Sequence, residues 1–254
     1  DSGGEYKRLE VAQPILDNTD LERIRRIENH VDGSFRTYTL DICYSVEEQS
    51  NQKMDAAIIT LCEQAEQVVA DHGYNIIVLS DRAMDAEHIA VPALLAIGAV
   101  HHHLIRKGLR TEVGLVIETG EARRVHDFCL LAGYGAEAIN PYVAFDTLTN
   151  IGREKRDYFS EEDAHKNYVK AVNKGILKVM SKMGISTYQS YCGAQIFDAV
   201  GLSTDFVEKY FMGTATKVEG IGISEIAKET EKRHAWAFNS GLEYRNELSV
   251  EGDL

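Results

Sequence analysis

Residues 75–80 read Asn-Ile-Ile-Val-Leu-Ser and form the clearest strand signal in the chain. The polar turn Ser80-Asp81-Arg82 ends this apolar run. Pro92 then opens a helical pattern, in the first-turn position where a helix accepts proline, and Gly108 stops it. This stretch therefore predicts a strand, a polar turn and a helix, in that order.

The same succession recurs on both sides of residues 75–80. One helical pattern ends at Gly73, where a C-cap glycine belongs, and a later one ends at Gly133. Strands are expected at 37–44, 75–80, 112–118 and 138–140, and helices at 51–71, 92–107, 121–131 and from 141 onward.

Strands that alternate with helices in this way pair in parallel through right-handed crossovers. The predicted fold class is therefore α/β, with repeated βα units on a mainly parallel sheet and a helical C-terminal part. An incomplete or open (β/α)-barrel-like domain is the prediction, and an open doubly wound sheet is the alternative. We divide the chain into an N-terminal segment at 1–36, a βα core at 37–149, and the remaining βα units with a helical C-terminal connection at 150–254.

The last third of the chain has a weaker pattern. Residues 150–166 are dense in charge, which favours an exposed loop or short helix. A helical pattern runs from about 164 to 183, and residues 184–193 are rich in turn formers. Further helices are expected at 194–200, ended by Gly201, and at 204–211 and 224–238.

The composition is that of a globular protein large enough to bury a substantial core. The chain has 254 residues, of which 44% are hydrophobic and 26% are charged. Its net charge of −13 repels phosphate backbones, so we expect no nucleic-acid partner. No apolar run reaches the roughly 18 residues that a membrane span needs, so we also expect no membrane partner.

Four cysteines are spread along the chain, at Cys43, Cys62, Cys129 and Cys192. None forms the closely spaced pair that holds zinc or an iron–sulfur cluster. So few cysteines in a chain of this length do not suggest a disulfide scaffold. We interpret them as reduced and mostly buried.

Polar residues follow the predicted strands, where sites lie in folds of this kind. Their carboxylates could serve as catalytic acids and bases, or they could cap helices and form ion pairs. Without a metal or cofactor motif we favour the structural role. These strand-end residues are Ser80, Asp81, Arg82, Glu118, Thr119, Glu121 and Asn140.

Three other patterns carry little functional signal. The run His101-His102-His103 cannot face one metal, because neighbouring helical residues point about 100° apart. The glycine turns at 213–216 and 220–222 match no phosphate-binding motif. Lys178 and Lys182 are four residues apart, which favours one exposed helix face over a Schiff-base site.

The sequence itself resembles the central domain of the glutamate synthase large chain, over nearly its whole length and in order. The resemblance is carried by Leu79-Ser-Asp-Arg82, Pro92-Ala-Leu-Leu95, Ala99-Val-His-His-His-Leu-Ile-Arg106, Gly108-Leu-Arg-Thr111, Glu118-Thr-Gly-Glu-Ala-Arg123, Gly133-Tyr-Gly-Ala-Glu-Ala-Ile-Asn-Pro-Tyr142, Lys178-Val-Met-Ser-Lys-Met-Gly-Ile-Ser186, Gln189-Ser-Tyr-Cys-Gly-Ala-Gln-Ile-Phe197 and Tyr210-Phe-Met-Gly-Thr214.

The resemblance implies a part in ammonia assimilation and glutamate biosynthesis. In this family a glutaminase domain releases ammonia, which passes through a tunnel to an FMN-binding synthase domain and there joins 2-oxoglutarate. An iron–sulfur cluster brings the electrons. The central domain connects and orients these two partner domains. The resemblance also implies a location in the cytoplasm, or in the plastid stroma in a plant or alga.

The family's catalytic groups are expected outside these residues. The chain has no N-terminal cysteine nucleophile, and the flavin-binding, 2-oxoglutarate-binding and cluster-binding motifs would follow Leu254. We therefore expect no catalytic, cofactor-binding or metal-binding residue here, and no glutamate synthase activity from this chain alone. The alternative is an independent (β/α)-barrel-like enzyme that binds FMN or a phosphorylated ligand at its strand ends.

Overall fold

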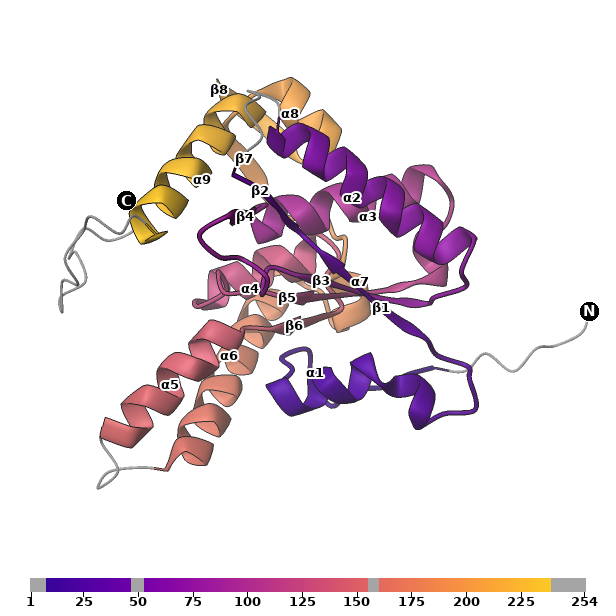
Figure 1. The fold of residues 1–254 in the computed structure, drawn as a ribbon, viewed down its shortest axis with the longest axis vertical. Coiled ribbons are helices and arrows are strands. Elements are labelled where there is room, and N and C mark those ends of the chain that lie inside the picture. The colour runs from indigo at the N-terminus through magenta and orange to yellow at the C-terminus, as the bar shows by residue number, and fades with distance from the viewer. Residues whose placement is uncertain (1–7, 47–52, 155–159, 239–254) are drawn as a thin grey trace, which may run out of the picture.

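A four-stranded parallel sheet forms the centre of the molecule. The structure is a computed structural model that describes residues 8–46, 53–154 and 160–238. The strands lie in the order β1-β3-β5-β6, which is also their order in the sequence (Figure 1). They are β1 (Thr37–Asp41), β3 (Ile76–Ser80), β5 (Gly114–Glu118) and β6 (Ala138–Asn140). All three pairings are parallel, so the α/β prediction is confirmed.

Three helices follow these strands and share one face of the sheet. They are α2 (Lys53–Ala70), α3 (Ala93–Arg106) and α4 (Val125–Gly133). Their buried side chains join Leu40, Ile77, Leu79 and Ile117 of the strands in one core cluster. Parallel strands in sequential order, with their helices on a single face, are the arrangement of part of a (β/α) barrel that has not closed into a ring.

A different helix covers the opposite face, which a closed barrel would fill with strand side chains alone. This helix is α1 (Asn18–Arg25), and Asp17 caps its first turn by accepting the Asp20 N–H at 2.7 Å. Leu21 and Ile24 pack there against Val78 and the other inward residues of β3, β5 and β6. Within the described residues the sheet therefore stays open, with a helix where a barrel would have its interior.

The predicted element boundaries need local corrections in this core. The expected strand at 37–44 is two strands, because β2 (Cys43–Ser45) leaves the sheet and pairs antiparallel with β4 (His88–Ala90). The helix expected from 121 begins at Val125, where the Asp127 carboxylate accepts the N–H of Arg124 at 2.8 Å. Short 3-10 turns occur at Ile27–Asn29 and Arg110–Glu112.

Two long helices form a hairpin that projects from the sheet (Figure 1). They are α5 (Tyr142–Glu154) and α6 (Glu161–Met183), and α6 also packs against α4. Ser160 caps α6 at its start, and Gly184 ends it with a φ of 71°, a left-handed conformation that favours glycine. The charged segment expected at 150–166 thus contains the end of one helix and the start of the next, with residues 155–159 outside the described part.

The C-terminal part holds a second, two-stranded parallel sheet, β7 (Asp198–Leu202) with β8 (Ala215–Ile221). Three helices accompany it, namely α7 (Tyr188–Tyr191), α8 (Thr204–Tyr210) and α9 (Ile223–Phe238). The helix expected at 194–200 is wrong, because these residues lead into β7. A Cβ on Gly220 would lie 2.0 Å from the carbonyl oxygen of Gly201, so the glycine is what lets these two chain segments meet.

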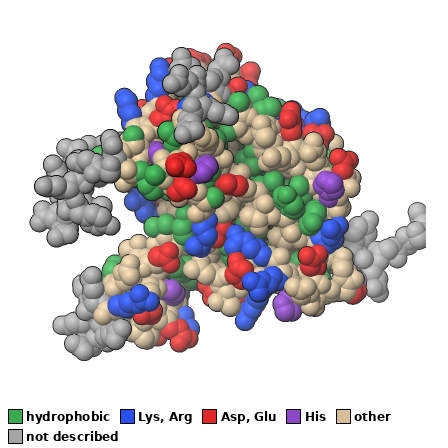
Figure 2. All heavy atoms as spheres, in the orientation of Figure 1, with side chains coloured by type: hydrophobic (Ala, Val, Ile, Leu, Met, Phe, Trp, Pro, Cys, Tyr) green, Lys and Arg blue, Asp and Glu red, His purple; other side chains and the backbone are tan. Residues whose placement is uncertain are grey.

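The four cysteines are free thiols, buried or half-buried in the described structure. Figure 2 shows acidic and basic side chains interspersed over the face in view, among patches of hydrophobic side chains. No helix in the described ranges has both the length and the apolar character of a membrane span.

Candidate functional site

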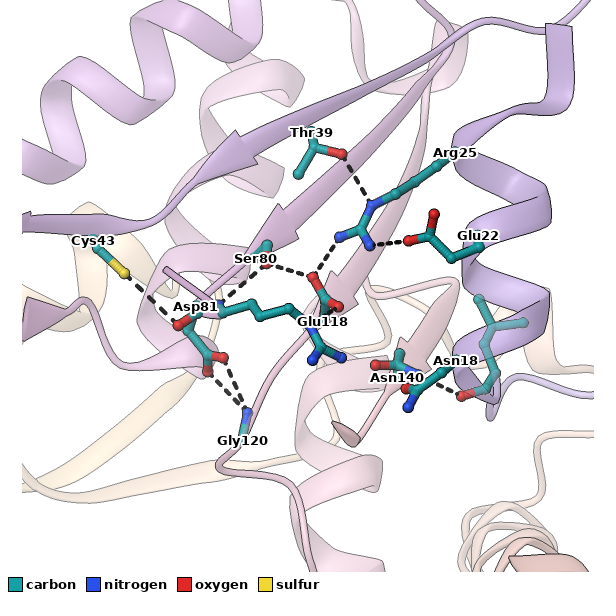
Figure 3. A network of polar contacts seen from close by, with 12 residues as sticks. Asn18, Glu22, Arg25, Thr39, Cys43, Ser80, Asp81, Glu118, Gly120 and Asn140 are labelled. Atoms are coloured by element: carbon teal, nitrogen blue, oxygen red, sulfur yellow. Dashed lines mark hydrogen bonds and ion pairs between the residues drawn. The ribbon is translucent and has the colours of Figure 1, made fainter. Parts of the chain in front are cut away.

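The carboxyl ends of the strands bring together most of the polar residues that sequence analysis selected. The strand register aligns Ser80 with Glu118, and Glu118 with Asn140, in one row across the sheet. Asp81, Arg82 and Thr119 directly follow their strands. Figure 3 shows this strand-end cluster, with Arg25 reaching it from α1. Parallel pairing is the reason, because it places the ends of successive strands at the same edge.

Glu118 is the centre of the cluster, and its side chain has no exposed surface. Its carboxylate accepts hydrogen bonds from Arg25 Nη2 at 2.5 Å, Ser80 Oγ at 2.5 Å and Arg82 Nε at 2.6 Å. Burial by itself would raise the pKa of Glu118, but these three donors outweigh it and lower the pKa below its ordinary value. The carboxylate is therefore held ionised between two guanidinium groups.

Asp81 lies beside Glu118 in a different environment. Its carboxylate accepts hydrogen bonds from Thr119 Oγ1 at 2.6 Å and from the Gly120 N–H at 3.0 Å. Burial raises the pKa of Asp81, and the charge of Glu118 raises it further, against the lowering effect of its hydrogen bonds. The two acidic groups thus have pKa values shifted in opposite directions.

Asn140 joins the N-terminal segment to the end of β6. Its Nδ2 group donates to the Leu16 carbonyl and to Asn18 Oδ1, each at 3.0 Å, and the side chain is fully buried. Its Oδ1 atom has no hydrogen-bond partner among the described residues. Asn140 therefore acts as a clamp between the sheet and the start of α1.

Glu121 lies apart from this cluster, and its carboxylate contacts the start of α3. Its carboxylate accepts the N–H of Ala93 at 2.7 Å, one of the unpaired donors of the first turn of α3. The preceding residue, Pro92, has no N–H to offer. Sequence analysis allowed these carboxylates to cap the helices that follow them, whereas Glu121 caps α3, which precedes it.

Opposite pKa shifts in two neighbouring carboxyl groups are a pattern found in acid–base catalysis. A substrate must also reach them, and here Asp81 is 3% exposed and Glu118 is 0% exposed. Three cavities lie elsewhere on the molecule, and none of the three is lined by Ser80, Asp81, Glu118 or Asn140. What the arrangement does chemically is to bind the N-terminal segment to the sheet through charge-assisted hydrogen bonds.

Arg25 is the member of the cluster that sequence reasoning missed. It lies 93 residues from Glu118 in the sequence, within a segment for which no helix was predicted. Its Nε also donates to Thr39 Oγ1 at 3.4 Å. The pattern of α1 itself, with an acidic first turn and Arg23 and Arg25 in the last turn, could have signalled the helix, but not its ion-pair partner.

The three adjacent histidines have separate environments. His101 Nδ1 accepts a hydrogen bond from Arg110 Nε at 2.9 Å, while His103 Nε2 lies 2.8 Å from a Glu66 carboxylate oxygen. The ring of His102 is buried without a hydrogen-bond partner among the described residues. Across the described ranges, no group of three or more His, Cys, Asp or Glu side chains is placed to hold a metal ion.

The remaining candidates are surface features or structural glycines. Lys178 and Lys182 are exposed along α6, as their spacing predicts. Residues 213–216 form the turn into β8 and its first residues, and residues 220–222 close that strand.

Known proteins resemble the chain over most of its length. Residues 1–203 match the family model described as the glutamate synthase central domain. The chain is 41% identical over 232 residues to the NADPH glutamate synthase large chain of Bacillus subtilis, covering 91% of this chain and 15% of that protein. It is 40% identical to the NADH glutamate synthase of Schizosaccharomyces pombe over 90% of this chain and 11% of that protein. The ferredoxin-dependent enzyme of Pyropia yezoensis is 36% identical over 92% of this chain and 15% of that protein.

Solved structures show a weaker likeness. A flavocytochrome b2 mutant with pyruvate bound aligns with 79% of this chain and 45% of that chain, at 13% identity and a TM-score of 0.44. A mandelate oxidase mutant aligns with 69% of this chain and 58% of that chain, at 14% identity and a TM-score of 0.44.

Proposed function

Because the chain belongs to the glutamate synthase central-domain family, we propose that it is the scaffold domain of a glutamate synthase. In this role it links a glutaminase domain to an FMN-dependent synthase domain in ammonia assimilation. The chain spans only 11% to 15% of the length of the three curated relatives reported above. The reaction of the whole enzyme, from glutamine, 2-oxoglutarate and a reductant to glutamate, is therefore part of the proposal.

The observation that carries this proposal is the closed strand-end cluster. Enzymes built from βα units bind their substrates at the carboxyl ends of the strands. Here the Glu118 carboxylate at that position is fully buried and bound by Arg25, Ser80 and Arg82. A site whose charges are neutralised by the chain's own residues supports a structural role over a catalytic one.

We also propose how the chain is divided. We propose a single domain, in which the N-terminal segment 1–36 folds onto the βα core 37–149 through α1, and residues 150–254 lead toward the synthase domain. No residue of the chain is assigned a catalytic, cofactor-binding or metal-binding role. FMN and an iron–sulfur cluster belong to the other parts of the proposed enzyme, which works in the cytoplasm or, in a plant or alga, in the plastid stroma.

The names of the relatives differ in one respect that bears on the electron donor. They specify NADPH, NADH or ferredoxin, while the region they share with this chain is 36% to 41% identical. A scaffold domain that does not contact the electron donor can be the same in enzymes that use different donors. The proposal therefore commits to no donor for this chain.

Two measurements on the purified chain test the proposed function. We expect a colourless protein that turns over neither glutamine nor 2-oxoglutarate. Adding the chain to separately produced glutaminase and synthase parts should couple glutamine hydrolysis to glutamate formation, and a mixture without the chain should not. A yellow protein with a flavin absorption band would instead support the independent FMN-binding enzyme and overturn the scaffold role.

A further inference from the structure

The two edges of the central sheet differ in how their backbone groups are satisfied. At the β6 edge, the Leu16 N–H donates to the Ile139 carbonyl at 2.9 Å, and the Ile139 N–H donates to the Pro14 carbonyl at 2.8 Å. Ile15 forms a parallel bridge with Ile139 there. Residues 14–16 thus cover that edge with a short extended segment.

The β1 edge has no such cover within the described ranges. Ile42 donates its N–H to Ser80, and Arg36 accepts from Ile76, so the even-numbered residues bond to β3. In a parallel pair the alternate residues point their N–H and C=O groups the other way. The outward residues are Thr37, Thr39 and Asp41, whose backbone groups hydrogen-bond to none of the described residues.

A groove runs beside this free edge, between β1 and α2, with a volume of about 1120 Å³. Small or polar side chains of α2 line it, including Ala57, Thr60 and Gln64, and Tyr38 on the strand is 40% exposed. The hydroxyl of Tyr44, another lining residue, is buried without a hydrogen-bond partner among the described residues. This hydroxyl is enclosed by the chain's own residues, so a segment lying in the groove does not reach it.

The charge of the groove limits what can lie in it. Among the described residues that line it, the basic side chains are Arg36, Lys53 and His72 and the acidic one is Asp41, in a chain whose net charge is −13. Arg36 and Lys53 are held along the walls, by the His72 carbonyl at 2.7 Å and the Val46 carbonyl at 2.7 Å respectively. A neutral or acidic segment therefore suits the groove better than a basic one.

We propose that β1 accepts a further strand from a part of the enzyme outside these 254 residues. The occupant is an extended, neutral-to-acidic segment that hydrogen-bonds with Thr37, Thr39 and Asp41 and places alternate side chains in the groove beside α2. Addition of a strand to a free sheet edge is an established mode of docking between protein parts. This inference rests on the proposed function, since the relatives carry most of their length outside the region that this chain spans.

Hydrogen exchange at single amides tests the proposal, with the 254-residue chain compared to the assembled enzyme that contains it. In the isolated chain at low concentration, the amides of Thr39 and Asp41 should exchange freely, while Leu40 is protected by β3. In the assembled enzyme we expect exchange at Thr39 and Asp41 to slow by at least about tenfold, as for other paired strands. Equal exchange rates in the two samples would overturn the proposal.

Two further outcomes would also overturn it, each by naming another occupant. Protection of Thr39 in the isolated, monomeric chain would mean that the chain covers its own edge. Protection that rises with the concentration of the isolated chain would mean that a second copy occupies it. If the assembled enzyme does not synthesise glutamate, the proposed function is wrong. The exchange rates at Thr39 and Asp41 still decide whether a strand docks on β1.

A matched pair of substitutions gives the second test. Thr39→Pro removes the outward N–H and keeps the bonds of Tyr38 and Leu40 to β3, whereas Thr39→Ala removes the same hydroxyl but keeps the N–H. We expect Thr39→Pro, but not Thr39→Ala, to restore fast exchange at Asp41 in the assembled enzyme. If both variants leave Asp41 equally protected, no strand docks on β1. The exchange protection of Leu40 in each isolated variant shows whether the pairing with β3 is intact.

Discussion

The strand-end cluster and the β1 edge lie on the same sheet but reach opposite outcomes. At the strand ends, Glu118 is fully buried and bound by three side chains from different parts of the sequence. At the edge, the outward backbone groups of Thr37, Thr39 and Asp41 bond to none of the described residues. At the strand ends, where βα enzymes bind substrates, the polar groups are satisfied by the chain's own side chains. At the β1 edge, the outward backbone groups have no partner among the described residues and can accept another strand.

The difference shows what the N-terminal segment contributes to this fold. Residues 14–16 close the β6 edge, and α1 brings Arg25 to the buried Glu118 carboxylate. Without α1, the core side chains of Val78 and Val116 and the charge of Glu118 would face solvent. A segment that sequence analysis left without structure therefore turns a potential site into part of the interior.

The largest expected effect is on the closed side of this comparison. Glu118→Ala removes the buried carboxylate that pairs Arg25 and Arg82, whose side chains are 23% and 44% exposed. Loss of one partner from a buried ion pair costs about 3–5 kcal/mol of unfolding free energy, and we expect the lower end because water can solvate the two arginines. Urea denaturation of the isolated chain measures the change. The control Glu112→Ala removes a carboxylate outside the cluster, and an equal loss there would contradict the central role of Glu118.

A somewhat smaller effect is expected from the core contact of α1. Leu21 is 1% exposed and packs in the cluster on the inner face of the sheet. Leu21→Ala should lower the unfolding free energy by about 2–4 kcal/mol, through lost burial and the cavity that remains. Exchange at the Glu118 amide should also become faster if α1 is the cover. Destabilisation without any change there would separate α1 from the strand-end cluster.

The strand-end cluster and the buried histidines His101 and His102 should affect stability in different pH ranges. Burial and the nearby charge of Arg110 lower the pKa of His101 to about 3, and burial and Arg106 lower that of His102 to about 4. Below about pH 6.5 the unfolded chain binds these protons and the folded chain does not, so stability is lost as the pH falls. The slope is about 1.4 kcal/mol per pH unit for each histidine.

Glu118 contributes in a lower pH window than the two histidines. Because its pKa is lowered, its stabilisation is present above the ordinary pKa of about 4.3 and is lost as the pH falls below it. Between pH 7 and 5 the two histidines should therefore make stability fall with falling pH, while the raised pKa of Asp81 acts in the opposite direction. The double substitution His101→Gln with His102→Gln should flatten this slope, and an unchanged slope would assign it to other groups.

The smallest expected effect is at the open edge. Tyr44→Phe removes a buried hydroxyl that bonds to no described residue, so the isolated chain should change by less than about 1 kcal/mol. In the assembled enzyme the change should be equally small, because the hydroxyl is enclosed in the core and a strand docked on β1 does not reach it. Differential scanning calorimetry of both forms makes the comparison. A marked loss in the isolated chain alone would place the partner of Tyr44 within these 254 residues.

Local patterns predicted much of the sheet and its neighbouring helices. Ile76–Ser80 and Gly114–Glu118 lie within their predicted ranges, because buried parallel strands are continuous apolar runs bounded by polar turns. The helix at Ala93–Arg106 begins after Pro92 and stops before Gly108, as these residues indicate. The selection of Ser80, Asp81 and Glu118 as neighbours also followed from parallel pairing alone.

Other features had no local signal strong enough to predict them. The segment 194–200 has a composition compatible with a short helix, and its pairing with β8 decides that it leads into a strand. Such non-local pairing overrides weak propensity. The role of Glu121 as a cap for α3 also depends on a contact across 28 residues.

The sequence by itself determined the family, the alternation of strands and helices, and the residues that gather at the strand ends. The family follows from the resemblance of the quoted segments, and the other two follow from periodicity and from position after each strand, which are local properties of the chain. Only the tertiary structure decided that α1 covers the inner face, that Arg25 binds Glu118, and that no described residue pairs with the β1 edge. The physical reason is that burial and ion pairing depend on segments far apart in the sequence, whose meeting is set by the packing of the whole domain.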